Sequence, residues 1–268
     1  MMIKKNIGII SLSLFILSSC GSVPITGRQQ LLLVSDSEIL SSSLTQYDSF
    51  IKSSEKSNSV SKTNMVKRVG KRIAEATEHY LRENGLENEI ANFKWEFNLV
   101  KDQQVNAFCM PGGKIVVYEG LMKLAKTDNE LAVVLGHEVA HAVAKHSNER
   151  MSQQLAAKYG AKILTSSLSN KSQTIQGLAS NVYGLGAQYG LMLPFSRKHE
   201  SEADYMGLVF MTIAGYDPGV AINFWKKMSL SSKGQIPEFL STHPSDATRI
   251  NAIYKAIPEI RRKYQGNK

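Results

Sequence analysis

The segment HEVAH at residues 137–141 constrains this chain more than any other feature of its sequence. His137 and His141 stand four residues apart in an apolar run, and Thr127 and Glu130 before it have the spacing of a helix-capping box. On a helix, residues four apart differ in direction by about 40°, so both imidazoles leave one face, one turn apart. The sequence therefore predicts a central helix that presents two nitrogen ligands to one metal ion.

Three carboxylates complete the predicted site. Glu138 is turned about 60° from His141, where it can take a proton from a water beside the metal. A catalytic zinc keeps three protein ligands, so one more His, Glu or Asp is needed. Glu200 and Asp204 lie four apart on a second predicted helix. We expect Glu200 to be the third ligand, with His199 as its competitor, and Asp204 to accept the second ring N–H of a ligand histidine.

These residues carry a family resemblance. HEVAH at 137–141 followed by ESEAD at 200–204 resembles the HtpX-like zinc metallopeptidases, the family that includes the CAAX prenyl proteases. Residues 106–122 are similar to that family's segment before the central helix, and residues 239–250 to its C-terminal His-Pro segment. The resemblance implies a zincin-like domain with one Zn2+ per chain, in the exported lipoprotein branch of the family. It assigns the metal ligands to His137, His141 and Glu200.

The N-terminus has the composition of an export signal. Two lysines precede an apolar stretch over residues 7–17, which is shorter than the roughly 20 residues that cross a bilayer. Residues 17–20, Leu-Ser-Ser-Cys, resemble a bacterial lipobox. We therefore expect residues 1–19 to be a signal peptide and acyl chains on Cys20 to anchor the protein to a membrane. Gly21 favours the periplasmic face of the outer membrane, with a Gram-positive cell surface as the alternative.

Charge and cysteine content narrow the possible functions. The net charge of +9 falls to about +7 without the leader's two lysines, and it is spread along the chain. The sequence contains no basic run interleaved with aromatic residues, so it does not indicate a nucleic-acid site. With Cys20 acylated, Cys109 is the remaining thiol, which excludes a disulfide framework. The sequence makes no prediction of oligomeric state.

Patterning predicts a mainly α protein with a small β-sheet, an α+β fold. Residues 20–34 are expected to be a linker, and residues 35–268 a single zinc metallopeptidase domain. Helical periodicity and capping residues indicate two helices before the sheet, and helical patterning again dominates from about residue 128 onward. The predicted elements before that point are helices over 35–52 and 62–84 and strands over 93–100 and 114–118.

The second predicted strand is a candidate substrate-binding segment. Pro111, Gly112 and Gly113 form a turn that leads into it and permits close backbone approach. An edge strand there could pair with an extended peptide through main-chain hydrogen bonds, which suits many different substrates. A plain hairpin turn is the alternative. The residues assigned to substrate binding are Lys114, Ile115, Val116, Val117 and Tyr118.

His243 is a tentative catalytic residue. Pro244 biases it toward an extended conformation before a helix that begins near Ser245. Its imidazole could steady the oxyanion of the tetrahedral intermediate, or it could occupy the place of the attacking water in a resting state. A residue at a helix entry with no catalytic part is the third possibility.

Together these features predict a zinc-dependent endopeptidase, anchored as a lipoprotein, that cleaves misfolded or unassembled envelope proteins. The alternative is a chaperone-like lipoprotein that binds unfolded chains, with cleavage repressed or absent. Open coordination favours the enzyme, and a closed set of four protein ligands favours the binder. A zinc hydrolase acting on a non-peptide amide is a third reading. Residues 151–192 are either packing helices or a cover over the cleft.

Overall fold

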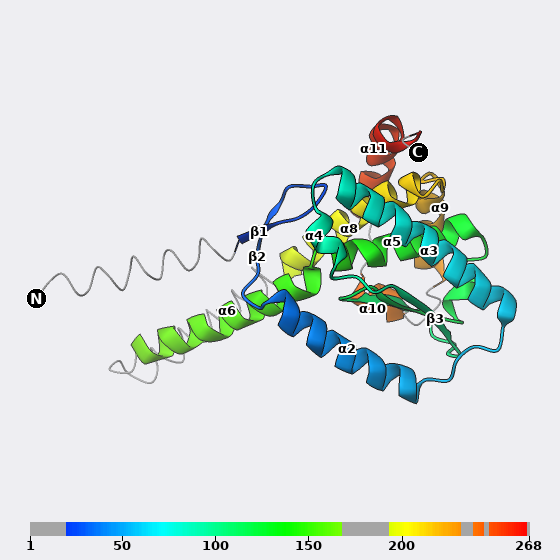
Figure 1. Ribbon diagram of the computed structural model, residues 1–268. Coiled ribbons are helices and arrows are strands. Elements are labelled where there is room, and N and C mark those ends of the chain that lie inside the picture. Colours follow the sequence, from blue (N-terminus) through cyan, green and yellow to red (C-terminus); the bar gives the residue numbers. More distant parts are fainter. Residues whose placement is uncertain (1–19, 168–192, 232–237, 244–246, 267–268) are drawn as a thin grey trace, which may run out of the picture. The chain divides into compact units, whose positions relative to one another are not determined.

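The computed structural model describes residues 20–167, 193–231, 238–243 and 247–266 (Figure 1). Contacts divide the chain into two compact units. The first is Met1–Ile39 with Lys145–Phe195, and the second is Leu40–Ala144 with Ser196–Lys268. Within the described ranges, no helix is both long enough and apolar enough to cross a membrane.

The first unit contains a β-hairpin and a long helix. β1 (Cys20–Ser22) pairs antiparallel with β2 (Gln29–Leu31), and α6 spans His146–Ser167. The Arg28 guanidinium donates two hydrogen bonds, of 2.8 and 2.7 Å, to the buried Glu149 carboxylate on α6. The segment predicted to be a linker is therefore partly structured. Of the segment 151–192, the part through residue 167 is helical and residues 168–192 lie outside the described ranges.

A three-stranded sheet lies in the second unit. β3 (Glu96–Val100) pairs in parallel with β5 (Lys114–Tyr118), and β4 (Ala107–Met110) pairs antiparallel with the other side of β5. The turn between β4 and β5 requires its glycines, because Gly112 and Gly113 have φ of 91° and 80°. The order is therefore β3-β5-β4, with β5 in the centre.

This order corrects the prediction for substrate binding. Lys114, Ile115, Val116, Val117 and Tyr118 are all buried, and β5 has a hydrogen-bonded strand on each side. A peptide cannot add to a strand whose two edges are already paired. The edge assignment was wrong because β4, a four-residue strand without clear alternation, was not predicted.

The remaining elements are helical, and the predicted mainly α fold with a small sheet is confirmed. The predicted helix boundaries before the sheet agree with the structure to within two residues. β3 begins later than predicted, at Glu96, and the rings of Phe93 and Trp95 ahead of it stack with 4.7 Å between centroids. The helices are α2 (Asp36–Ser53), α3 (Val60–Glu83), α4 (Glu87–Ile90), a 3-10 turn (Leu121–Lys123), α5 (Asp128–Val143), α8 (Leu193–Ile213), α9 (Val220–Leu230), α10 (Glu238–Thr242) and α11 (Ala247–Tyr264).

Helices cover both faces of the sheet (Figure 1). From α2, Tyr47, Phe50 and Ile51 pack with Val116 and Tyr118 in one apolar cluster. Across the sheet, α3 contacts β3 and α5 contacts β4. The buried sheet therefore fixes α5 beside the edge strand.

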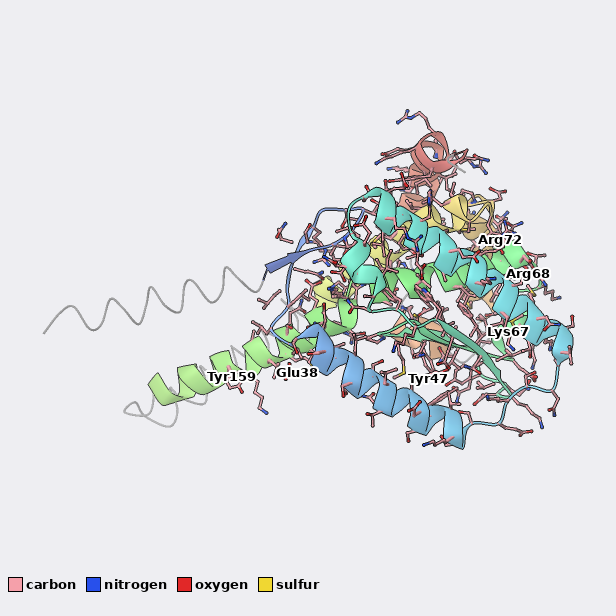
Figure 2. The ribbon with its side chains drawn as sticks, viewed as in Figure 1. Glu38, Tyr47, Lys67, Arg68, Arg72 and Tyr159 are labelled. Atoms are coloured by element: carbon pink, nitrogen blue, oxygen red, sulfur yellow. The ribbon has the colours of Figure 1, made fainter. Side chains whose placement is uncertain are left out.

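The start of α5 is held by a capping box and by Arg68 of α3. Thr127 Oγ1 accepts the Glu130 N–H at 3.2 Å, and the Glu130 carboxylate accepts the Thr127 N–H at 3.1 Å, which confirms the predicted capping box. Arg68 donates to both oxygens of Asp128, at 2.8 and 2.6 Å. Arg72, one turn along the same side of α3 (Figure 2), donates to the carbonyl of Ala214 at 2.6 Å. These contacts fix α5 and the end of α8 against one helix.

Candidate metal centre

The structure brings the three predicted ligands together. His137 and His141 lie one turn apart on α5, with their Nε2 atoms 3.1 Å apart. The Glu200 carboxylate of α8 spans both rings, with Oε2 3.3 Å from His137 Nε2 and Oε1 3.3 Å from His141 Nε2. His199, the competing ligand, is not among the residues of this group. The helix geometry inferred from the sequence therefore holds in three dimensions.

His243 joins the same group. It follows α10, with its ring stacked on Phe239 at 4.7 Å between centroids. Its Nδ1 lies 3.0 Å from Glu200 Oε1 and 3.3 Å from His137 Nε2. The ligand atoms of His137, His141, Glu200 and His243 all lie within 4.8 Å of one another. The three residues after His243 lie outside the described ranges, so the predicted helix entry there is not described.

The donor set fits a zinc ion. Zinc bonds of about 2 Å in a tetrahedron place neighbouring ligand atoms about 3.3 Å apart, and the contacts above range from 3.0 to 3.3 Å. Glu200 Oε2 is buried and accepts no hydrogen bond of good geometry within the described residues, although Arg249 Nη1 lies 3.1 Å and His137 Nε2 3.3 Å from it. A buried carboxylate needs cationic partners, and a zinc ion held by this group would be one beside Arg249. Imidazole and carboxylate ligands are those that zinc prefers.

The environment keeps Glu200 ionised. Burial alone would raise the pKa of Glu200, but hydrogen bonds with His137, His141 and His243 outweigh it and hold the pKa far below its usual range. Burial would also lower the pKa of His137, yet hydrogen bonds with Asp204 and Glu200 raise it to about 9. Without metal, a proton therefore occupies this site, and a cation must displace it.

Glu138 lies beside the ligands, in the position expected of a general base. Its Oε1 is buried, accepts no hydrogen bond within the described part of the chain, and lies 3.5 Å from His243 Nε2. Its Oε2 accepts the backbone N–H of Cys109 on β4, at 3.3 Å. Burial raises the pKa of Glu138, although the charges of His243 and His137 partly oppose that rise. The carboxylate thus faces both the ligand group and the edge strand.

Asp204 holds His137 as predicted. Its Oδ1 lies 3.1 Å from His137 Nδ1, so the carboxylate accepts the ring N–H that points away from the ligand group. Burial alone would raise the pKa of Asp204, but the charge of Arg249 and its hydrogen bonds hold that pKa below its usual range. This contact leaves His137 Nε2 free to face Glu200.

Arg249 was not predicted as a site residue. It lies on α11, is 5% exposed, and donates to both oxygens of Asp204. One sequence signal could have identified it, since Arg249 shares the helical spacing of the buried residues Ile253, Ile257 and Ile260. An arginine on the apolar face of a helix requires a buried anionic partner.

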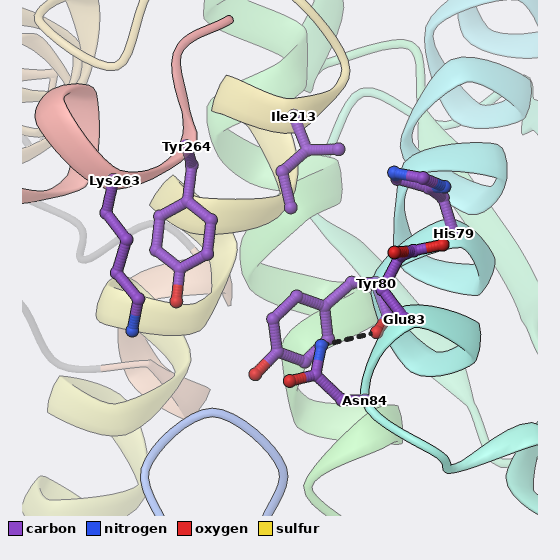
Figure 3. Close-up of a pocket in the computed structure, with 7 residues that line it drawn as sticks. All are labelled: His79, Tyr80, Glu83, Asn84, Ile213, Lys263 and Tyr264. Carbon is purple, nitrogen blue, oxygen red and sulfur yellow. Dashed lines mark hydrogen bonds between the residues drawn. The ribbon is translucent and has the colours of Figure 1, made fainter. Parts of the chain in front are cut away.

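A pocket of the second unit lies apart from this group. It is formed where the ends of α3, α8 and α11 meet, with the rings of Tyr80 and Tyr264 at its centre (Figure 3). None of its lining residues belongs to the metal group. They are His79, Tyr80, Glu83, Asn84, Ile213, Lys263 and Tyr264.

Comparisons with known proteins agree with this site. Residues 62–257 match the family model described as Peptidase family M48. The mitochondrial metalloendopeptidase OMA1 of Schizosaccharomyces pombe is 39% identical over 177 residues, which cover 65% of this chain and 50% of that protein. Its human counterpart is 30% identical over 88% of this chain and 45% of its own length. A beta-barrel assembly-enhancing protease of Yersinia pestis is 33% identical over 59% of this chain and 33% of its own.

The chain spans about half the length, or less, of these curated relatives. They support the family as a whole and not the HtpX-like or CAAX prenyl protease branch that the motifs suggest. The family model covers most of the chain and includes every residue of the metal group. The chain therefore belongs to Peptidase family M48.

Proposed function

We propose that this chain is a zinc-dependent metalloendopeptidase. The observation that carries the proposal is the convergence of four ligand atoms from α5, α8 and the segment after α10, with Glu138 beside them. M48 metallopeptidases depend on zinc, and the group can hold one ion. His137, His141 and Glu200 are the ligands that we assign to it.

The chemistry follows from this arrangement. A zinc ion bound there would polarise the scissile carbonyl and lower the pKa of a water toward about 7. Glu138 takes a proton from the attacking water and passes it to the leaving amine. Its burial suits that exchange, because a raised carboxyl pKa brings proton uptake and release closer to neutral pH. Asp204 fixes the His137 ring, so that Nε2 stays directed at the ligand group.

We assign His243 to a resting state of the site. Its Nδ1 lies among the ligand atoms, in the fourth position that the attacking water requires. The His243 side chain is 14% exposed, and the residue follows a helix of five residues. The side chain can therefore move away from the other ligand atoms without disturbing α5 or α8. The position of His243 among the ligand atoms also favours the second candidate function. This is a binding protein whose cleavage activity is repressed because four protein ligands surround the metal. The oxyanion role remains the alternative for His243.

The substrate-binding edge is reassigned to β4. The strand is at the edge of the sheet, and the Cys109 N–H on its outer side already points to the Glu138 carboxylate. An extended peptide that pairs with this edge would place its main chain beside the general base. Main-chain pairing accepts many sequences, which suits misfolded or unassembled polypeptides as substrates.

The location of the protein is part of the proposal. A signal peptide over residues 1–19 and acyl chains on Cys20 would make it a lipoprotein of the cell envelope, on the periplasmic face of the outer membrane. The lipobox-like residues 17–20 and a relative named as a beta-barrel assembly-enhancing protease support this location. Within the family, the chain would represent an exported lipoprotein. Mass spectrometry of the mature N-terminus tests the acylation directly.

Substitution of the base tests the function. Glu138→Gln should retain one zinc per chain and lose casein digestion by about 10²-fold to 10⁴-fold, because proton transfer is removed while the ligands remain. Glu75→Gln, which changes the same chemical group on the exposed side of α3, is the matched control and should digest casein normally. A Glu138→Gln protein that digests casein at the wild-type rate would contradict the proposal.

A further inference from the structure

We infer that Arg249 is a positioning residue that joins two carboxylates of α8, Glu200 and Asp204, and the segment carrying His243 into one unit. The inference rests on the proposed metal centre and adds a function for a residue outside the ligand set. Arg249 supplies no ligand atom, although it contacts the carboxylate of the ligand Glu200. It acts from behind, through the side chains and the backbone that direct those atoms.

Among the residues that the structure describes, the guanidinium reaches three acceptor groups. Its Nε and Nη2 donate to the two oxygens of Asp204, each at 2.7 Å. Its Nη1 lies 3.1 Å from Glu200 Oε2 and donates a long hydrogen bond, of 3.4 Å, to the backbone carbonyl of His243. The paired contacts with Asp204 fix the plane of the guanidinium, and that plane directs Nη1 to the other two acceptors.

Each contact constrains a different part of the metal centre. Arg249 fixes the orientation of the Asp204 carboxylate. That carboxylate in turn fixes the His137 ring through its hydrogen bond with Nδ1. Glu200 Oε2 is turned toward both Arg249 and His137, which leaves Oε1 for His141 and His243. The carbonyl contact ties the backbone of His243 to the same cation.

Burial makes these contacts specific to arginine. The side chain is 6% exposed and lies 5.3 Å from the centre of the Trp225 ring, in a cation–π contact. A buried cation is stable only with anionic partners, which Asp204 and Glu200 provide. Lysine would keep the charge but has one ammonium, which cannot bond bidentately to a carboxylate and also reach two further acceptors. The geometry therefore depends on the shape of the guanidinium as well as on its charge.

Metal affinity and backbone protection test this function without a peptidase assay. Arg249→Met and Arg249→Lys should bind zinc about 10-fold to 100-fold more weakly than the wild type, measured by competition with a chelator. The visible spectrum of the cobalt-substituted protein should change in both variants. Hydrogen exchange at the His243 amide, which donates to the Phe239 carbonyl, should be faster than in the wild type. Arg261→Met, on the same helix but paired with Asp217 at the surface, should match the wild type in all three measurements.

The outcomes separate this inference from the proposed function. Arg249→Lys preserves the buried charge, so it can fold even where Arg249→Met removes that charge from beside two buried carboxylates. A folded Arg249→Lys protein with zinc affinity within about twofold of the wild type overturns the positioning role. Failure of both variants to fold also overturns it, because Arg249 would then be needed for the fold itself. A wild-type protein that binds no zinc overturns the metal centre and with it this inference.

Discussion

Gly136 and Gly207 lie in contact where α5 crosses α8. A Cβ atom at Gly207 would lie 2.8 Å from the carbonyl carbon of Gly136 and from the backbone nitrogen of His137. Gly136 directly precedes the first ligand histidine, and Gly207 follows Asp204 by three residues. The two backbones therefore approach closely at the level of the site. This distance sets how far the Glu200 carboxylate must reach to the two imidazoles.

Gly207→Ala should separate the two helices and weaken metal binding. The methyl group would meet backbone atoms, which cannot rotate away as a side chain can, so we expect a loss of about 1–3 kcal/mol in the free energy of unfolding. Zinc affinity should fall as well, measured by chelator competition. Gly70→Ala on α3 is the matched control, because its Cβ would crowd the Phe97 ring and not the ligand helices. Equal zinc affinity in the two variants would contradict the role of the crossing.

His243→Ala should raise casein digestion. If the imidazole occupies the position of the attacking water, its removal opens that position while three ligands keep the zinc. Zinc content and the initial rate of digestion are the measurements. A rate reduced by about 10²-fold or more would instead indicate an oxyanion role, and an unchanged rate would remove His243 from the mechanism.

Cys109→Pro should weaken peptide binding with little effect on zinc. The change removes the Cys109 N–H, which lies on the outer edge of β4 and donates to Glu138 Oε2, so KM for extended peptides should rise by about fivefold to tenfold and kcat should fall as the base loses this support. Cys109→Val retains the N–H and controls for loss of the thiol. If Cys109→Pro is folded and its KM equals that of Cys109→Val, peptides do not pair with this edge.

The protein without metal should lose stability as the pH rises. The pKa of His137 is raised from 6.5 to about 9, so its contribution is fully present below pH 6.5 and disappears as the pH passes about 9. The loss should be on the order of 3 kcal/mol in the free energy of unfolding. Urea unfolding after chelator treatment measures it at both ends of that range. His137→Asn should remove most of the dependence, and a wild-type protein with a flat profile would contradict the assignment.

The ligand helices were predictable from the sequence because their geometry is local. The angular spacing of His137 and His141 is fixed by the helix itself, and so is that of Glu200 and Asp204. The capping box of Thr127 and Glu130 also depends only on near neighbours along the chain. These features need no knowledge of how distant segments pack.

The features that were missed depend on tertiary contacts. β4 is four residues long, and only its pairing with β5 makes it a strand and moves Lys114–Tyr118 to the centre of the sheet. The spacing of Arg249 places it on the apolar face of α11, but only tertiary packing shows that Asp204 and Glu200 are its partners. The hairpin over residues 20–34 was read as a linker because its partner, α6, lies more than one hundred residues away.

The central claim is that α5 and α8 direct two imidazoles and one carboxylate at a single zinc ion. X-ray absorption at the zinc edge and a crystal structure of the zinc-loaded protein measure this directly. The account predicts one zinc per chain, with a Glu200 carboxylate oxygen and the Nε2 atoms of His137 and His141 each about 2 Å from it. A fully loaded protein in which Glu200 lies more than about 6 Å from the ion would contradict it.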